Sequence, residues 1–137
     1  KLQRVQNSLA RIVLKKHPRH PAQGLLSKLH WLPIEHRIKF KLATITYKAL
    51  SLNQPSYILS RLHPYQPAYH TRSADQKLLA KPTCSTSFGQ RAFSYAAPQI
   101  WDKIPLETRA STSIESFKRK LKSHFWTSLD LSVTFPA

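Results

Sequence analysis

Several residue types are scarce or absent in this sequence of 137 residues, which has no methionine, two glycines and one cysteine. Gly24 and Gly89 are too few and too far apart for the glycine-rich loops that hold nucleotide phosphates. Cys84 has no partner for an internal disulfide and no signal-peptide pattern is present, so we expect an intracellular location. Because methionine is absent and a helical pattern is already running at Leu2, we expect the chain to be a fragment of a longer polyprotein.

Acidic residues are also scarce, with six against 22 lysines and arginines, and this argues against an active site within the chain. Paired carboxylates that could hold metal ions for phosphoryl transfer are absent, and no nucleophile lies in a recognisable catalytic motif. His17 and His20 have the spacing of zinc ligands, but each precedes a proline and no second cysteine can complete the set. We therefore expect no catalytic residue, no metal, no cofactor and no small-molecule substrate.

The formal net charge of +16 is the strongest signal in the composition. Such a surplus creates a long-range positive potential that favours a polyanion, either nucleic acid or an anionic membrane. No run of residues approaches the roughly 18 apolar residues of a membrane span. Binding to a membrane surface would need exposed Trp, Phe or Leu side chains, which we assign to the core. We therefore expect nucleic acid, and no membrane, as the partner.

Apolar residues recur with helical spacing and predict a mainly α fold, a single small domain of about five helices over residues 1–137. Helices are expected at 2–16, at 34–52 after Pro33, and at 112–126 behind a Thr112–Glu115 capping box. The predicted buried face of the first helix is Leu2, Val5, Leu9, Ile12 and Val13. That of the second long helix is Ile34, Ile38, Leu42, Ile45, Ala49 and Leu52.

The remaining segments are predicted to be short helices, loops and extended pieces. Residues 25–33 and 55–62 favour short helices or turns, and the extended pieces 77–82 and 84–95 allow a short β-hairpin. The stretch 88–105 is rich in aromatic residues and is interpreted as a core strap containing Phe88, Phe93, Ile100 and Trp101. Trp31 and Phe117 are also assigned to the core. Residues 127–137 are expected to be a loose tail.

Basic residues on the predicted helix surfaces are the candidate binding residues. Arg37 and Lys41 are four residues apart, and like charges at that spacing weaken a helix by a few tenths of a kcal/mol, which suggests a surface meant for negative charge. The residues expected to contact phosphate are Arg4, Arg11, Lys15, Lys16, Arg37, Lys41, Lys48, Lys118, Arg119 and Lys122. In the central loop, Tyr65, Tyr69 and Arg72 could stack on unpaired bases, or the tyrosines could simply pin the loop down.

Six blocks in a fixed order carry a family resemblance over residues 2 to about 126. They are LQRVQNSLARIV, LHWLPIEHRIKFKLATITYKAL, PSYILSRLHPY, TRSADQKLLAKP, SFGQRAFSYAAPQIWDKIP and SIESFKRKLKSHFW. Together they closely resemble the C-terminal segment of the reverse transcriptase polyprotein of LINE-type non-LTR retrotransposons.

The resemblance implies a domain that follows an endonuclease and a reverse transcriptase, in the nucleus and cytoplasm, and contacts element RNA or target DNA during target-primed reverse transcription. The catalytic acids of that family belong to the upstream domains, so none is carried over to this chain. The zinc knuckle of some relatives is absent here as well. The upstream reverse transcriptase domain is then an expected partner.

Two other interpretations remain open. The chain could be a non-catalytic interaction or scaffold module that packs on the reverse transcriptase, in which case the isolated chain should expose a large apolar patch. It could also be a fragment of a decayed element that keeps a recognisable fold without activity.

Overall fold

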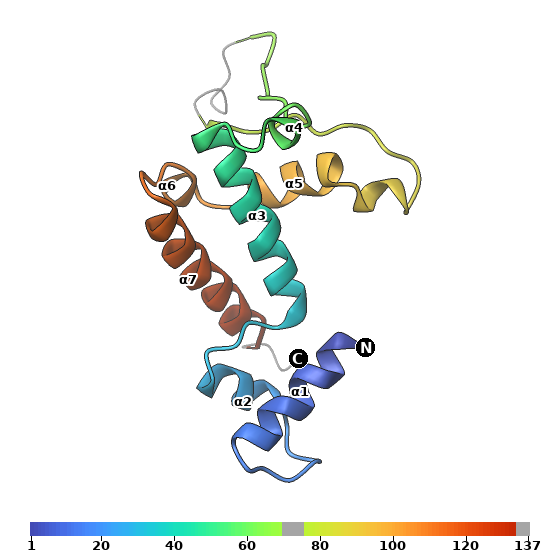
Figure 1. Cartoon of the computed structure of the whole chain (residues 1–137), viewed down its shortest axis with the longest axis vertical. Helices are drawn as coiled ribbons and strands as arrows, with labels where there is room; N and C mark the ends of the chain where they lie inside the picture. Colours follow the sequence, from blue (N-terminus) through green and yellow to red (C-terminus); the bar gives the residue numbers. More distant parts are fainter. Residues whose placement is uncertain (70–75, 134–137) are drawn as a thin grey trace.

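The computed structural model describes the backbone of residues 1–69 and 76–133 and the side chains as far as residue 129. This part of the chain forms seven α-helices and the 3-10 helix η2, and it contains no β-strand beyond an isolated bridge. The helices are α1 (Leu2–Val13), α2 (Gln23–Lys28), α3 (Ile34–Leu52), α4 (Ser56–Leu59), α5 (Phe93–Trp101), α6 (Leu106–Arg109) and α7 (Ile114–Val133), with η2 at Gly89–Arg91. The prediction of a small, mainly helical domain is confirmed (Figure 1).

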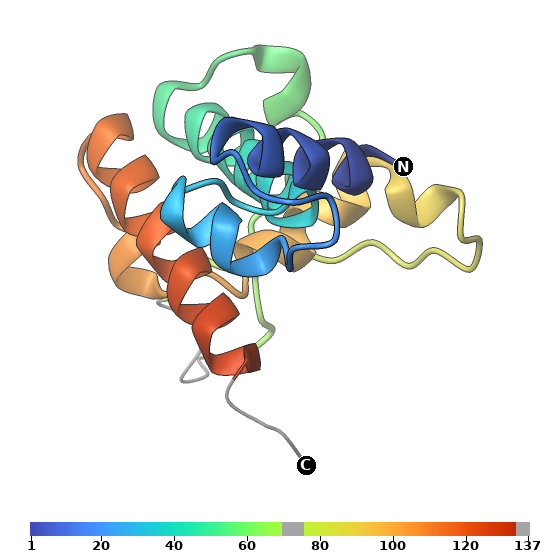
Figure 2. The same ribbon diagram turned by 90° about the horizontal axis from the view of Figure 1, so that it is seen from below.

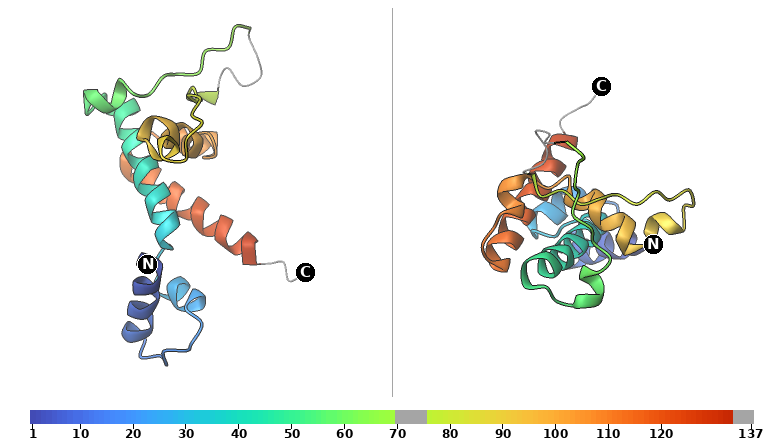
Figure 3. Two further views of the ribbon diagram at one scale, coloured as in Figure 1. Left: turned by 90° about the vertical axis from the view of Figure 1, so that its right-hand side faces the viewer. Right: turned by 90° about the horizontal axis from the view of Figure 1, so that it is seen from above.

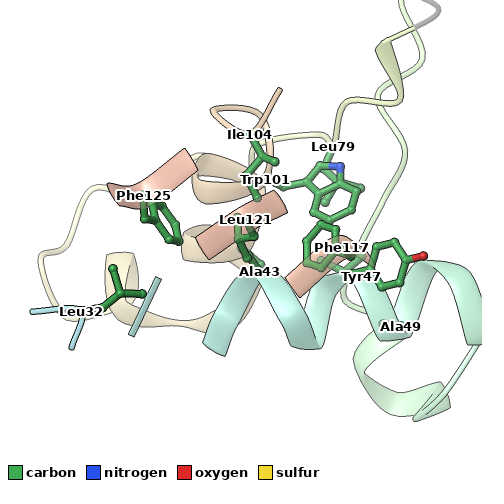
Figure 4. Close-up of a cluster of buried hydrophobic side chains, with 12 residues drawn as sticks. Leu32, Ala43, Tyr47, Ala49, Leu79, Trp101, Ile104, Phe117, Leu121 and Phe125 are labelled. Carbon is green, nitrogen blue, oxygen red and sulfur yellow. The ribbon is translucent and has the colours of Figure 1, made fainter. Parts of the chain in front are cut away.

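The larger part of the structure is built around α3, which packs against both α5 and α7. The Tyr47 ring stacks on Phe117 with ring centroids 4.2 Å apart, and the Trp101 ring lies 6.0 Å from Phe117 (Figure 4). The Tyr47 hydroxyl donates to the carbonyl oxygen of Ser111 at 2.6 Å, so its polar end is satisfied inside the core. The core positions predicted for Trp101 and Phe117 are confirmed, since both side chains are buried.

Helices α1 and α2, with the turns that follow them, form a smaller lobe over residues 2–31, the α1–α2 lobe. The two helices lie side by side when the molecule is seen from below (Figure 2), and both lie under the first turn of α3 (Figure 3, left). Its core is small: Ala10, Leu25 and Leu26 are buried, and Leu14, Leu29 and Trp31 pack around them. Trp31, predicted for the core, is therefore only half-buried.

Both helices of the α1–α2 lobe end in left-handed turns. Lys15 has φ 50° and His30 has φ 52°, although neither is glycine. The amide of Lys16 bonds to the carbonyl of Arg11 at 2.8 Å, and that of Trp31 to the carbonyl of Leu26 at 2.9 Å, the long bond of a Schellman motif. The turn at Lys15 ends α1 at Val13, three residues before the predicted end.

The segment that follows residue 76 is held by side chains and does not form the β-hairpin allowed for at 77–95. Its single bridge within the described residues joins Leu79 to Pro64. The Trp101 indole donates to the carbonyl of Lys77 at 3.1 Å, and Asp102 accepts from the amide of Leu79 at 3.2 Å. The amide of Ala80 bonds to the carbonyl of His63 at 2.8 Å, and the carbonyl of Leu78 accepts from the amide of Tyr65 at 2.9 Å. Peptide groups of this segment are thus satisfied by the segment after α4 and by two side chains, and not by a hairpin with 84–95.

The stretch 88–105 is helical and only partly buried. Phe88 is 81% exposed, so its assignment to the core was wrong, whereas Phe93 and Ile100 pack against the core from half-buried positions. Pro98 lies inside α5 and is buried. Phe88 immediately precedes η2, which has no buried residue, and contact with the core begins at Phe93, where α5 starts.

Helix α7 begins one residue later than its predicted capping box requires. The Ser113 hydroxyl accepts from the amide of Ser116 at 3.2 Å, so Ser113 is the capping residue and the Thr112–Glu115 box is not the cap. The helix continues to Val133, past residue 126 where the apolar pattern ended. Residues 134–137 of the predicted tail lie outside the described part of the chain.

Candidate nucleic-acid interface

Helix α1 is attached to the rest of the molecule by its polar face. Gln6 is buried, and its side-chain amide donates to the carbonyl of Leu32 at 2.9 Å. The Gln3 side-chain oxygen accepts from the amide of Ile34 at 2.9 Å and so caps the free N-terminus of α3. Gln3 also donates to Gln6 and to Asn7, at 3.0 and 2.8 Å. These polar bonds orient α1 against the start of α3.

The apolar face of α1 consequently points outward, and its predicted burial was wrong. Leu2 is 67% exposed, Leu9 48% and Ile12 71%, and Val5 and Val13 are also exposed. The buried residues are Gln6 and Ala10, on the flank of the helix that adjoins the apolar stripe. The spacing of apolar residues identified the helix correctly, but the partner that it meets within the described residues is too small to cover that face.

Helix α3 buries an arc that overlaps the predicted one only in part: Ala49 is buried as expected, and Ile34, Leu42 and Ile45 are half-buried. Ile38 and Leu52 are exposed, while Ala43, Thr44, Thr46, Tyr47 and Ala49 are buried. Thr44 and Thr46 can be buried because their hydroxyls donate to the carbonyls of Phe40 and Leu42 at 2.8 and 2.9 Å. Sequence reasoning missed this arc because it lies between α5 and α7, and such neighbours cannot be read from periodicity.

The candidate phosphate-binding residues of α3 and α7 are exposed. They are Arg37, Lys41, Lys48, Lys118, Arg119 and Lys122. Arg37 and Lys41 of α3 and Lys122 of α7 line one groove of about 840 Å³. We call this the α1–α3 groove. Leu2, Val5 and Leu9 of α1 also line it, and we call them its apolar wall. We call the half-buried lining residues Trp31 and Phe40 its floor, and the three exposed cations its rim.

The remaining candidates are dispersed. Arg4, Lys15 and Lys16 are exposed on the α1–α2 lobe, and Arg11 is half-buried because its Nε donates to the carbonyl of His20 at 2.8 Å. Tyr65 and Tyr69 are 45% and 84% exposed, in the segment after α4 at the opposite end of the molecule (Figure 1). Arg72 lies outside the described residues. The structure therefore gathers only three of the predicted residues around one site.

Few of the cations are neutralised. Within the described side chains, Lys39 pairs with Glu35 at 2.6 Å and Lys81 with Asp102 at 3.1 Å, and no other ion pair is present. The hydrogen bond and charge of Lys39 lower the pKa of Glu35, whereas the cations of the α1–α3 groove have no acidic partner in the described part. Unpaired cations around one groove produce a locally positive potential.

One basic residue has a structural role that sequence reasoning did not find. Arg109 is buried, and its guanidinium donates to the carbonyls of Gln76 and Lys77 at 2.5 and 3.4 Å. Burial lowers the pKa of Arg109, although the nearby Asp102 opposes the shift. The residues around Arg109 in the sequence do not indicate that it is buried, because its hydrogen-bond partners lie more than 30 residues away.

Other kinds of site find little support in the described part of the chain. No three His, Cys, Asp or Glu side chains there lie close enough together to hold a metal ion. None of the helices there has the length and apolar character needed to cross a membrane. Comparisons with protein-family models, curated proteins and solved structures found no match to this chain.

Proposed function

We propose that this chain is the nucleic-acid-binding C-terminal domain of a LINE-type retrotransposon reverse transcriptase. The six ordered sequence blocks support the family, and the net charge of +16 supports a polyanionic partner. The observation that carries the binding role is the meeting of Arg37, Lys41 and Lys122 from two helices at one groove, without acidic partners in the described residues. The domain would act in the nucleus and cytoplasm, beside the polymerase that copies the element RNA.

In this role the domain positions RNA or DNA and takes no part in the chemistry. Arg37 and Lys41 are one helical turn apart on α3, and Lys48 lies two turns further along the same helix. This row of exposed cations would follow a phosphate backbone, with Lys118 and Lys122 of α7 making a second row. Contacts of this kind give affinity without sequence specificity.

A salt titration tests the proposal. With about eight phosphates neutralised, log affinity for RNA or DNA should fall against log salt with a slope near −6 to −7. The triple variant Arg37→Gln, Lys41→Gln, Lys122→Gln should make that slope shallower by about 2 to 3, since each lost contact removes about 0.7 to 0.9. A wild-type slope shallower than about −2 would contradict the proposal.

A matched variant controls for the loss of net charge alone. Lys28→Gln, Arg61→Gln, Lys103→Gln also removes three positive charges, at exposed residues that do not line the α1–α3 groove. Its slope should stay close to that of the wild type. Equal effects of the two triple variants would show that the charge acts as a diffuse field, with no particular site.

A second function, docking on a protein partner such as the reverse transcriptase domain, is supported by a separate observation. The outward face of α1 exposes five large apolar residues, which are Leu2, Val5, Leu9, Ile12 and Val13. Monomeric soluble proteins rarely leave so contiguous an apolar face in water. A binding measurement between this chain and the separately expressed reverse transcriptase domain tests the idea directly.

A further inference from the structure

The exposed apolar residues of α1 fall into two groups. Leu2, Val5 and Leu9 line the α1–α3 groove, whereas Ile12 and Val13 lie outside it. The first group faces a concave surface whose floor includes the half-buried Trp31 and Phe40. An apolar side chain entering this groove would therefore meet apolar groups on more than one side, which the outer group does not provide.

The rim of the groove adds a charge requirement. Arg37, Lys41 and Lys122 line it, and no described carboxylate pairs with them. Among the described residues, no Asp or Glu side chain lines the groove. An occupant with apolar residues for the floor and carboxylates for the rim would satisfy both features.

We propose that the α1–α3 groove binds an amphipathic helix whose apolar stripe is flanked by acidic side chains. The inference rests on the second proposed function and names the chemistry of that partner. Leu2, Val5 and Leu9 line the groove over two turns of α1, and an amphipathic helix docks on such an apolar surface through side chains spaced at i, i+3 or i+4, and i+7. Carboxylates beside that stripe reach the three cations of the rim, which also favours this partner over a neutral one.

Other occupants fit these observations less well. A second copy of the chain would bring a net charge of +16 against +16. A flat bilayer would contact Ile12 and Val13 as readily as Leu2, Val5 and Leu9, and it would not use a concave floor. A nucleic acid offers phosphates for the rim but no aliphatic groups for the leucine and valine side chains of α1.

Fluorescence anisotropy with the full chain provides the test. The probe is a labelled 20-residue helical peptide with leucines on one face and glutamates flanking them, and the control probe has the same composition with its leucines dispersed. We expect the amphipathic probe to bind at least about tenfold more tightly than the dispersed one, a difference of about 1.4 kcal/mol. Equal affinity for the two probes would overturn the proposal.

Two double variants locate the site. Val5→Asn, Leu9→Asn should weaken binding of the amphipathic probe at least about tenfold, and Ile12→Asn, Val13→Asn should change it less than about twofold. Both pairs are exposed in the chain, so both variants should fold, as circular dichroism can check. An equal loss of peptide affinity in the two double variants would overturn the proposal. Binding of the chain to phosphatidylserine vesicles that both double variants weaken equally would also overturn it.

RNA binding by the same variants separates this proposal from the first function. The Val5→Asn, Leu9→Asn variant should keep wild-type affinity for RNA while losing the peptide. If the peptide fails to bind while RNA affinity retains its steep salt dependence, the groove proposal fails and the nucleic-acid proposal stands. If the Val5→Asn, Leu9→Asn variant loses RNA affinity as well as the peptide, the apolar residues of the groove do not serve the peptide alone, and the assignment of Leu2, Val5 and Leu9 to an amphipathic helix is wrong.

Discussion

Helices α1 and α7 are both amphipathic and basic, yet they present opposite faces to the molecule. In α7 the apolar stripe is buried, with Phe117 and Leu121 fully covered and Phe125 nearly so. In α1 the apolar stripe is exposed, and Gln6 and Ala10 are buried in its place. The difference teaches that periodicity identifies a helix, whereas the face that is buried depends on the partners within reach.

The physical reason lies in the size of the surfaces that meet each helix. α7 packs along α3 and against α6, and its apolar stripe joins a broad core cluster with Tyr47 of α3, Trp101 of α5 and Ile104 of the turn after α5. α1 meets the first turn of α3 and the six-residue α2, and there the free amide of Ile34 and the carbonyl of Leu32 need polar partners. Glutamines satisfy those groups, so the polar face turns inward.

The largest expected effect is a contrast in stability between the two apolar stripes. Phe117→Ala should lower the free energy of unfolding by about 3–5 kcal/mol, because it removes a buried ring stacked on Tyr47. Leu9→Ala should lower it by less than about 0.5 kcal/mol, because that side chain is half in solvent already. Urea denaturation followed by circular dichroism measures both, and a comparable loss in the two variants would remove the contrast.

A smaller effect is expected at the polar face of α1. Gln6→Ala leaves the carbonyl of Leu32 without its donor, and the unsatisfied group should cost about 1–2 kcal/mol. The loss should be concentrated in the α1–α2 lobe, so amide hydrogen exchange in α1 should accelerate more than exchange in α7. Val5→Ala, on the outward face of the same helix, is the control and should leave exchange nearly unchanged. Faster exchange with Val5→Ala than with Gln6→Ala would mean that the apolar face holds the lobe.

Much of the secondary structure could be predicted from the sequence, because it depends on local signals. The spacing of apolar residues located α1, α3 and α7, and Pro33 correctly marked the start of α3. The ends of helices were less accurate, since the left-handed turn at Lys15 has no glycine to announce it. A positive φ angle is uncommon for a lysine, so the sequence does not indicate this turn.

The candidate site was harder to predict, because it depends on contacts between distant segments. The unpaired cations Arg37, Lys41 and Lys122 were all proposed from charge, but their meeting at one groove requires the packing of α1, α3 and α7. The apolar wall of that groove was assigned to the core. Arg109 is buried and bonds to the carbonyl of Gln76, more than 30 residues earlier, which no local sequence signal indicates.

The smallest expected effect is a pH dependence at the junction of the two regions. His36, on the first turns of α3, lies edge-on to Phe125 of α7, and it shares a cavity with Gln3 and Asn7 of α1. Its Nδ1 is buried and has no hydrogen-bond partner among the described residues. Burial, with the charge of Lys39, lowers the pKa of His36 below 6.5, and Glu35 opposes this only in part. Protonation therefore favours the unfolded chain.

The sign of the pH effect follows from that shift. Above the unfolded pKa, His36 is neutral in both states and its full contribution to stability is present. As the pH falls from about 6.5 through the lowered folded pKa, the unfolded chain takes up the proton first, and the contribution is lost. The urea midpoint of the wild type should therefore fall over this window more than that of His36→Gln. The exposed His63→Gln is the control and should follow the wild type. If His36→Gln keeps the wild-type pH dependence, protonation of this imidazole does not control stability at the place where α1, α3 and α7 meet, and the prediction is wrong.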